Sequence, residues 1–198
     1  VRQDYLIAQG LLAPFENGLP TDIKMLKMAL ERLKQLSAHE VGHTLGLMHN
    51  YAASTINRSS VMDYPHPAAY INASGNIDIS NAYDDKIGAW DKMSINWGYA
   101  EFAQGVNEKE ALNNILYNAY KNGLRYLTDQ DARPAGSVSG LAHLWDNGNN
   151  IIEELKNVMK VREKALQQFS ENNILPGTPL AMLEDVLVPI YFYNRYQI

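Results

Sequence analysis

Apolar residues recur every three to four positions over much of the chain, which is the period of an amphipathic helix. Thr21 or Asp22 can cap the first turn of the earliest clear run, and Gly46 is suited to end it. The pattern therefore predicts a helix from about residue 21 to about residue 45. The residues of this run are Ile23, Leu26, Leu30, Leu33, Leu36 and Val41.

Further helices are predicted over residues 83–96, 107–123, 150–171 and 179–196. Asn107 can cap the second of them, and Pro189 falls inside the last and should kink it. The clearest strand signal lies in "AYINASGNIDIS", where a small hairpin would turn at Ser74 and Gly75. The chain is thus predicted to be mainly α-helical with one small β-hairpin, and residues 125–150 are expected to form a loop.

Composition narrows the class of protein. The 198 residues are 46% hydrophobic and 20% charged, as in an ordinary globular domain or a domain with an appended lobe. The net charge of -5 shows no excess of basic residues, which argues against nucleic acid as a partner. No apolar run reaches the roughly 18–20 residues that span a bilayer, so no transmembrane segment is predicted. The absence of cysteine excludes disulfides and thiolate metal sites.

The segment "SAHEVGHTLGLMHN", residues 37–50, holds three of the five histidines. His39 and His43 are four residues apart on the predicted helix, so their imidazoles share one face and can bind one Zn²⁺. Gly46 can adopt positive φ and end the helix, which lets the chain return with His49 as a third ligand. Three neutral nitrogens leave a fourth coordination position for water, as in catalytic zinc sites.

Glu40 follows the first of these histidines. A carboxylate there can take a proton from a metal-activated water and later give it to a leaving amine. The whole pattern is H-E-x-x-H-x-x-G-x-x-H, which should arise by chance on the order of once in 10⁵ chains of this length. A catalytically inactive metal site and a purely structural one remain alternatives to a hydrolytic centre.

The histidine pattern resembles that of the metzincin zinc metallopeptidases, whose second mark is a methionine turn below the metal. "SSVMDYP", residues 59–65, supplies such a turn, with Met62 as its floor. The form S-x-M-x-Y, met by Ser60, Met62 and Tyr64, looks most like the astacin and serralysin branches. There the tyrosine is a labile extra ligand or stabilises the oxyanion, so the resemblance implies a catalytic role for Tyr64.

A closer resemblance covers the whole chain. Together with the zinc motif, "SVMDYPHP", "IGAWDKMSINWGY", "TDQDARP" and "LEDVLVPIYFYNRYQ" look like a family of large, mostly bacterial zinc-dependent metalloproteases whose domain is described as a Met-zincin. Asn50 departs from the acidic residue that follows the third histidine in astacins, so astacin-like specificity is not implied.

Several neighbouring residues have competing interpretations. Asp63 lies twenty residues after His43, near where thermolysin-like enzymes place an acidic third ligand, although a local hydrogen bond within the turn suits it better. His66 is expected to be an exposed loop histidine between two prolines, and His143 a packed or partly exposed one. Asp91 is expected to cap or solvate a helix, and "TDQDARP" leaves a calcium site open.

The resemblance also predicts the domain organisation. Residues 1–100 would form a zinc-binding, metzincin-like core and residues 101–198 a helical C-terminal lobe. Metzincin-like folds place a mixed sheet before the zinc helix, and about twenty residues precede it here. We therefore expect that sheet subdomain upstream on the same polypeptide, and weak zinc retention with little proteolysis from these 198 residues alone.

The function predicted from the sequence is that of a zinc-dependent endopeptidase acting on peptides or proteins, secreted or in the cell envelope of a bacterium. Glu40 and Tyr64 would be its catalytic residues, and His39, His43 and His49 its zinc ligands. Two other classes stay open: a catalytically silent, metal-stabilised envelope binding module, and a hydrolase of a non-peptide amide bond.

Overall fold

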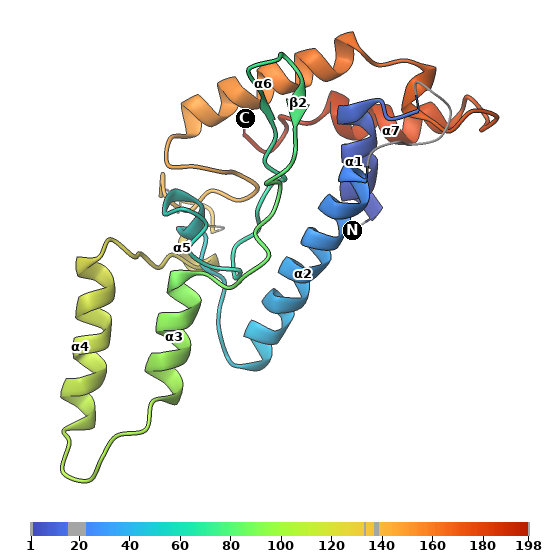
Figure 1. Ribbon diagram of the computed structural model, residues 1–198. Helices are drawn as coiled ribbons and strands as arrows, with labels where there is room; N and C mark the ends of the chain where they lie inside the picture. Colours follow the sequence, from blue (N-terminus) through green and yellow to red (C-terminus); the bar gives the residue numbers. More distant parts are fainter. Residues whose placement is uncertain (1, 16–22, 133, 137–138, 198) are drawn as a thin grey trace. The chain divides into compact units, whose positions relative to one another are not determined.

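The chain is mainly α-helical, as the sequence predicts (Figure 1). The computed structural model describes residues 2–15, 23–132, 134–136 and 139–197. Within these ranges no helix is long and apolar enough to cross a membrane. The elements are α1 (Arg2–Leu12), α2 (Lys24–Thr44), η1 (Ala53–Thr55), β1 (Tyr70–Ile71), β2 (Ile77–Asp78), α3 (Ala89–Tyr99), α4 (Glu108–Lys121), α5 (Asp129–Ala132), α6 (Ile151–Gln167), η2 (Glu171–Asn173) and α7 (Met182–Tyr191).

Two local predictions are confirmed with their expected turn residues. Helix α2 ends at Thr44, and Gly46 follows it with φ +82°. The hairpin pairs β1 with β2 in antiparallel register, Ile71 opposite Ile77, around Gly75 with φ +77°. Both glycines adopt the left-handed conformation that other residues rarely tolerate. The proposed caps at residues 21–22 lie outside the described residues.

Three segments differ from the prediction. Helix α1 was not predicted, because its apolar pattern is short and is interrupted by Gly10. In the structure this glycine allows close packing of α1 against α7, since a Cβ at Gly10 would lie 2.3 Å from Cγ1 of Ile190. Helix α3 begins at Ala89 because the Asp91 carboxylate accepts the N–H of Gly88 and caps the helix there. The four-residue helix α5 lies within the expected loop.

The chain folds into two compact units that do not follow sequence order. The first comprises Val1–Lys34, His66–Asp85 and Asn150–Ile198; the second comprises Gln35–Pro65 and Lys86–Asn149. The functional division near residue 100 stays a prediction.

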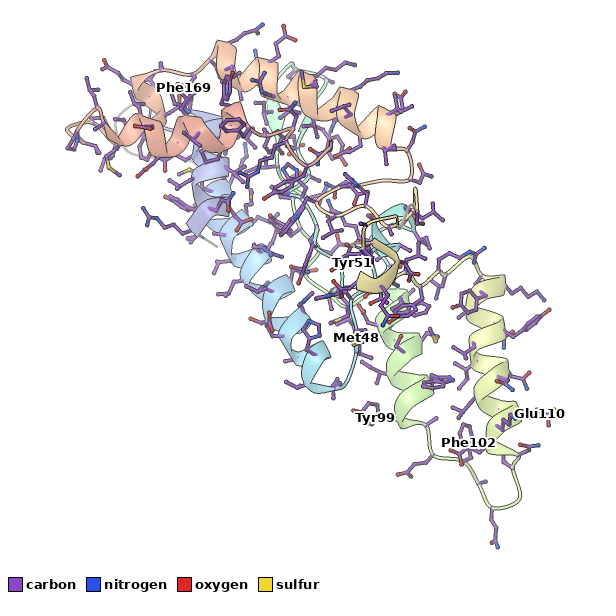
Figure 2. All side chains as sticks on the ribbon, turned by 180° about the vertical axis from the view of Figure 1, so that it is seen from behind. Met48, Tyr51, Tyr99, Phe102, Glu110 and Phe169 are labelled. Atoms are coloured by element: carbon purple, nitrogen blue, oxygen red, sulfur yellow. The ribbon has the colours of Figure 1, made fainter. Side chains whose placement is uncertain are left out.

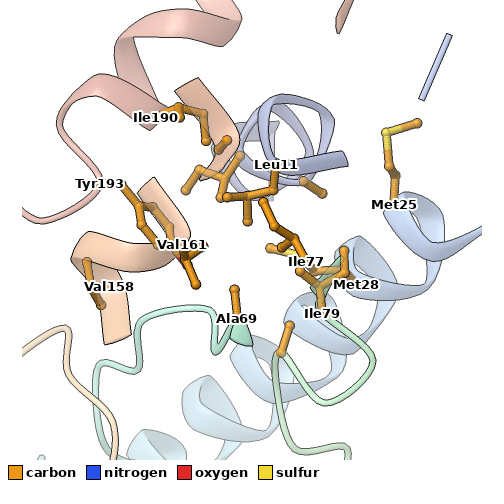
Figure 3. Packing of buried hydrophobic residues seen from close by; sticks show 14 of the residues in the cluster. Leu11, Met25, Met28, Ala69, Ile77, Ile79, Val158, Val161, Ile190 and Tyr193 are labelled. Atoms are coloured by element: carbon orange, nitrogen blue, oxygen red, sulfur yellow. The ribbon is translucent and has the colours of Figure 1, made fainter. Parts of the chain in front are cut away.

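The first unit is built around one apolar core (Figure 3). Helix α1 packs against α6 and α7, and the hairpin packs against α6. The side chains that fill this core come from every one of these elements and from the start of α2. Leu11, Met28, Ile77, Val161 and Ile190 are among them, each almost fully buried. Burial of this apolar surface is the main favourable term in folding the unit.

Helix α2 has two faces that differ in exposure. One is buried and includes Met25, Met28 and His39. The other, which produced the helical pattern in the sequence, is exposed: each of its side chains shows between 47% and 77% of its surface. This face together with the residue just before the helix, called here the α2 stripe, consists of Ile23, Leu26, Leu30, Leu33 and Val41.

The expectation that His66 is exposed is wrong. Its side chain is 6% exposed, and its ring centroid lies 4.5 Å from that of Tyr193. The Tyr193 hydroxyl donates to the carbonyl of Pro67 at 3.0 Å, which holds the segment inside the first unit. Burial lowers the pKa of His66 to about 4, because the imidazolium loses its hydration.

This histidine should make the fold sensitive to acid. Between its ordinary pKa of 6.5 and about 4, the unfolded chain binds a proton that the folded chain does not, so stability falls as the pH drops through this range. From pH 7 to pH 5 the loss should be about 2 kcal/mol. Urea unfolding of the wild type and His66→Phe at both pH values measures it; an equal pH dependence in the two proteins would contradict it.

Candidate metal centre

Three imidazoles converge in the second compact unit. His39 and His43 lie on α2, and His49 follows the turn at Gly46. One nitrogen from each ring can be chosen so that all three lie within 4.8 Å of one another. His39 Nε2 and His43 Nε2 are 3.1 Å apart. Among the described residues, this is the one cluster of histidine and carboxylate side chains with such geometry.

The other nitrogen of each ring is held by a hydrogen-bond acceptor. Nδ1 of His39 lies 2.7 Å from the Val61 carbonyl, and Nδ1 of His43 lies 2.9 Å from the Leu47 carbonyl. Nδ1 of His49 lies 2.6 Å from Oδ2 of Asp129. Carbonyl oxygens accept only, so the protons of the first two rings belong on Nδ1, and the Asp129 carboxylate favours the same tautomer in His49. All three Nε2 atoms then carry lone pairs.

These lone pairs are what a metal cation requires. Two of them face each other at 3.1 Å, which is repulsive when neither atom carries a proton. Nε2 of His49 is buried and has no hydrogen-bond partner. Burial also lowers the pKa of His39, with smaller contributions from His43 and His49, which favours its neutral, ligating form. The residues present therefore fit a divalent metal, and the imidazole set suits zinc, copper, iron or nickel.

The fourth residue of the zinc motif, Gly42, brings the methionine turn against α2. A Cβ at Gly42 would lie 2.3 Å from Sδ of Met62, whose side chain is completely buried. Only a glycine allows this close approach. The turn residues Ser60, Val61 and Met62 therefore lie directly against the metal-binding part of the helix.

The Asp91 side chain fixes this turn in place. Its carboxylate accepts hydrogen bonds from the Ser60 hydroxyl at 2.5 Å, the Val61 amide at 2.9 Å and the Gly88 amide at 2.7 Å. The Val61 carbonyl in turn accepts from Gln35 and contacts the His39 ring. The sequence indicated only that Asp91 caps or solvates a helix; the structure shows that it also orients a candidate ligand through Val61.

Tyr64 lies beside the histidines. Its ring centroid is 4.7 Å from that of His49 and 5.5 Å from that of His39. Trp145 stacks on its other side at 5.3 Å with an interplanar angle of 19°, and the Trp145 amide donates to the Tyr64 carbonyl at 2.9 Å. Trp145 does this with φ +60°, a conformation rare outside glycine and often found at functional sites. No pattern in the sequence predicted this contact.

Asp63 occupies a separate position. Its two carboxylate oxygens accept the backbone amides of Ser54 at 2.9 Å and Tyr64 at 2.7 Å, as expected for a side chain that bonds within the turn. Burial raises the pKa of Asp63 well above its usual range, and the nearby Asp146 adds to this. Glu40, in contrast, is an exposed side chain that follows His39 on α2. The catalytic roles of Glu40 and Tyr64 stay predictions.

Asp129 is the polar residue of this centre that sequence reasoning missed. It lies on α5, eighty residues after His49, and accepts a hydrogen bond from the Tyr51 hydroxyl at 2.8 Å. A carboxylate bonded to the outer nitrogen of a ligand histidine fixes its tautomer and raises its basicity. The sequence offered only an open calcium interpretation for "TDQDARP", because no local spacing links that segment to the histidines.

Asp129→Asn is expected to weaken zinc binding roughly 10- to 100-fold, since the neutral amide stabilises the ligating tautomer of His49 less well. The matched control is Asp131→Asn, on the same short helix, whose carboxylate accepts the Thr128 amide and contacts no histidine. Competition with a chromophoric chelator gives both affinities. Equal affinities in the two variants would show that Asp129 does not support the ligand.

The chain matches a known protein family. A family model described as Met-zincin matches residues 21–198, which is most of the chain and includes every residue discussed in this centre. No curated protein and no solved structure matches the chain.

Proposed function

The chain belongs to the Met-zincin family, and we propose that its three histidines hold the zinc ion of an endopeptidase. The observation that carries this proposal is the convergence of three imidazole rings on one point. The Nδ1 atom of each ring lies within hydrogen-bond distance of an acceptor, so its Nε2 atom is left to bind a metal. Three neutral histidines leave a coordination position free for substrate or water, which is the arrangement of catalytic rather than structural zinc.

Bound zinc would supply Lewis-acid chemistry, polarising a peptide carbonyl and lowering the pKa of water. Glu40 would take the proton from the attacking water and pass it to the leaving amine; its exposure next to His39 leaves the carboxylate accessible for this task. The Tyr64 phenol, beside the His39 and His49 rings, would donate a hydrogen bond to the oxyanion that develops on the carbonyl.

The test is peptide cleavage by the zinc-loaded polypeptide extended upstream of this chain, measured on a broad peptide library. Glu40→Gln should lower the cleavage rate by roughly 10²- to 10⁴-fold without loss of zinc. Glu101→Gln, also exposed but outside the centre, is the control and should retain full activity. Retained zinc with no peptide cleavage would favour a silent binding module; turnover of a non-peptide amide alone would favour the other hydrolase class.

We further propose that the α2 stripe is covered by a sheet subdomain upstream on the same polypeptide. The support is its size: the stripe exposes five large apolar side chains, and large exposed apolar surfaces mark interaction sites. Replacing Leu26 and Leu33 together by aspartate should leave the fold of the 198 residues intact. In the extended polypeptide it should abolish cleavage; unchanged cleavage there would refute this contact.

The proposed setting is the cell envelope or exterior of a bacterium, with peptides or proteins as substrates. The support is the likeness to bacterial metalloproteases described above. Fractionation of cells that produce the extended polypeptide tests it, and recovery in the cytoplasm alone would refute it.

A further inference from the structure

A cavity of about 430 Å³ lies within the second compact unit, next to the metal centre. Its thirteen lining residues come from the turn after α2, from α3 and α4, and from Tyr126. None of them carries a charged side chain. Two tryptophans, three tyrosines and two methionines give the cavity an aromatic and thioether surface that suits an uncharged ring.

The cavity has a buried floor and a solvent-exposed rim. Trp90 is almost fully buried and stacks on Tyr126, with ring centroids 5.3 Å apart and an interplanar angle of 6°. Met48, Trp97 and Tyr99 at the rim show between 42% and 58% of their surface. Figure 2 shows Met48 after α2 and Tyr99 at the end of α3. A firm aromatic floor under an accessible rim lets a side chain enter from solvent.

The wall of the cavity is continuous with the metal centre. Five residues join His43 to His49, and four of them, Leu45, Gly46, Leu47 and Met48, line the cavity. The Leu47 carbonyl contacts Nδ1 of His43 at 2.9 Å, and the Tyr99 hydroxyl donates to the Leu45 carbonyl at 3.0 Å. A polypeptide bound at the metal would therefore pass within a few residues of this wall, since an extended chain advances about 3.3 Å per residue.

We propose that this cavity binds an aromatic side chain of the peptide substrate; the peptide part of this assignment rests on the proposed function. A cavity lined without charge disfavours lysine, arginine, aspartate and glutamate, because each would lose its hydration without a partner. The volume is at the lower end of ligand sites, enough for one ring side chain and its flanking backbone. An acyl chain is also apolar and uncharged, and it is the competing ligand for this cavity.

Gly98 offers a direct way to fill the cavity. It lines the cavity, its φ is not positive, and a Cβ there meets no atom within 4 Å. Gly98→Leu therefore adds four side-chain carbons at the cavity lining, and the first of them meets no neighbouring atom. Gly140→Leu is the matched control: Gly140 also has nothing within 4 Å of its Cβ and lies outside the cavity.

The experiment measures binding of the uncharged fluorophore N-phenyl-1-naphthylamine to the whole chain, with circular dichroism as the folding control. Wild type and Gly140→Leu should bind it equally, and Gly98→Leu at least tenfold more weakly. Acetyl-Ala-Trp-Ala-amide should displace the fluorophore, and acetyl-Ala-Lys-Ala-amide should not.

Equal binding by Gly98→Leu would overturn the assignment of the cavity. Displacement of the fluorophore by dodecanol but not by the tryptophan peptide would overturn the assignment to a peptide side chain. The cavity would then be assigned to an acyl chain. These readouts need no catalysis. If the chain binds the tryptophan peptide while the zinc-loaded extended polypeptide cleaves no peptide, the proposed function is refuted and the aromatic site stands.

Discussion

Replacement of His49 by alanine in the polypeptide extended upstream of this chain is expected to abolish stoichiometric zinc binding at neutral pH. Structural zinc sites bind with about 10–16 kcal/mol in total, so one of three protein ligands accounts for roughly 3–5 kcal/mol, which is a loss of affinity on the order of 10²- to 10⁴-fold. The loss should be larger than that in Asp129→Asn, because the ligand itself is removed. Metal analysis after gel filtration measures the zinc content of each variant.

The informative control is Asp63→Asn. Asp63 is the competing acidic candidate, but both of its carboxylate oxygens accept backbone amides of Ser54 and Tyr64. The amide is of the same size, and burial already favours a neutral group at this position. This variant should lose some stability and keep its zinc once folded. Zinc lost from folded Asp63→Asn and retained by His49→Ala would reverse the ligand assignment.

Gly88→Ala should destabilise the second compact unit by roughly 3 kcal/mol or more. A Cβ at Gly88 would lie 2.0 Å from the carbonyl oxygen of Ser59, and backbone atoms cannot move aside as a flexible side chain can. Displacing Ser59 would also shift Val61, whose carbonyl orients His39. We therefore expect loss of zinc together with the lower unfolding midpoint in urea.

Gly98→Ala is the control for that substitution, because it makes the same chemical change on the same helix. Its Cβ meets nothing within 4 Å, so the variant should be unchanged or more stable by up to about 1 kcal/mol. If both alanine variants unfold at the same urea concentration, close packing of α3 against the methionine turn does not limit stability.

Local sequence predicted the parts of this molecule that depend on local chemistry. The helix before Gly46, the turn at Gly75 and the Asn107 cap, whose side chain accepts the Glu110 amide, all follow from the conformational preferences of a few neighbouring residues. The convergence of the three histidines belongs to the same class, because helical spacing and one glycine turn are enough to bring them together.

The features that sequence did not predict depend on residues far apart in the chain. Helix α1 is stabilised by its packing against α6 and α7, which no local pattern encodes. The burial of His66 depends on Tyr193, which follows it by more than a hundred residues. The α2 stripe shows the converse: its periodicity correctly predicted a helix, yet that face is the exposed one.

The histidine motif occupies eleven consecutive residues, but the acceptor that orients its last imidazole is encoded eighty positions later. Grafting those eleven residues onto a designed helical scaffold would copy the donor atoms and leave the third ring free to rotate. A minimal peptide mimic of this centre must therefore supply its own anionic acceptor, and a gene truncation ahead of residue 129 would remove the native one.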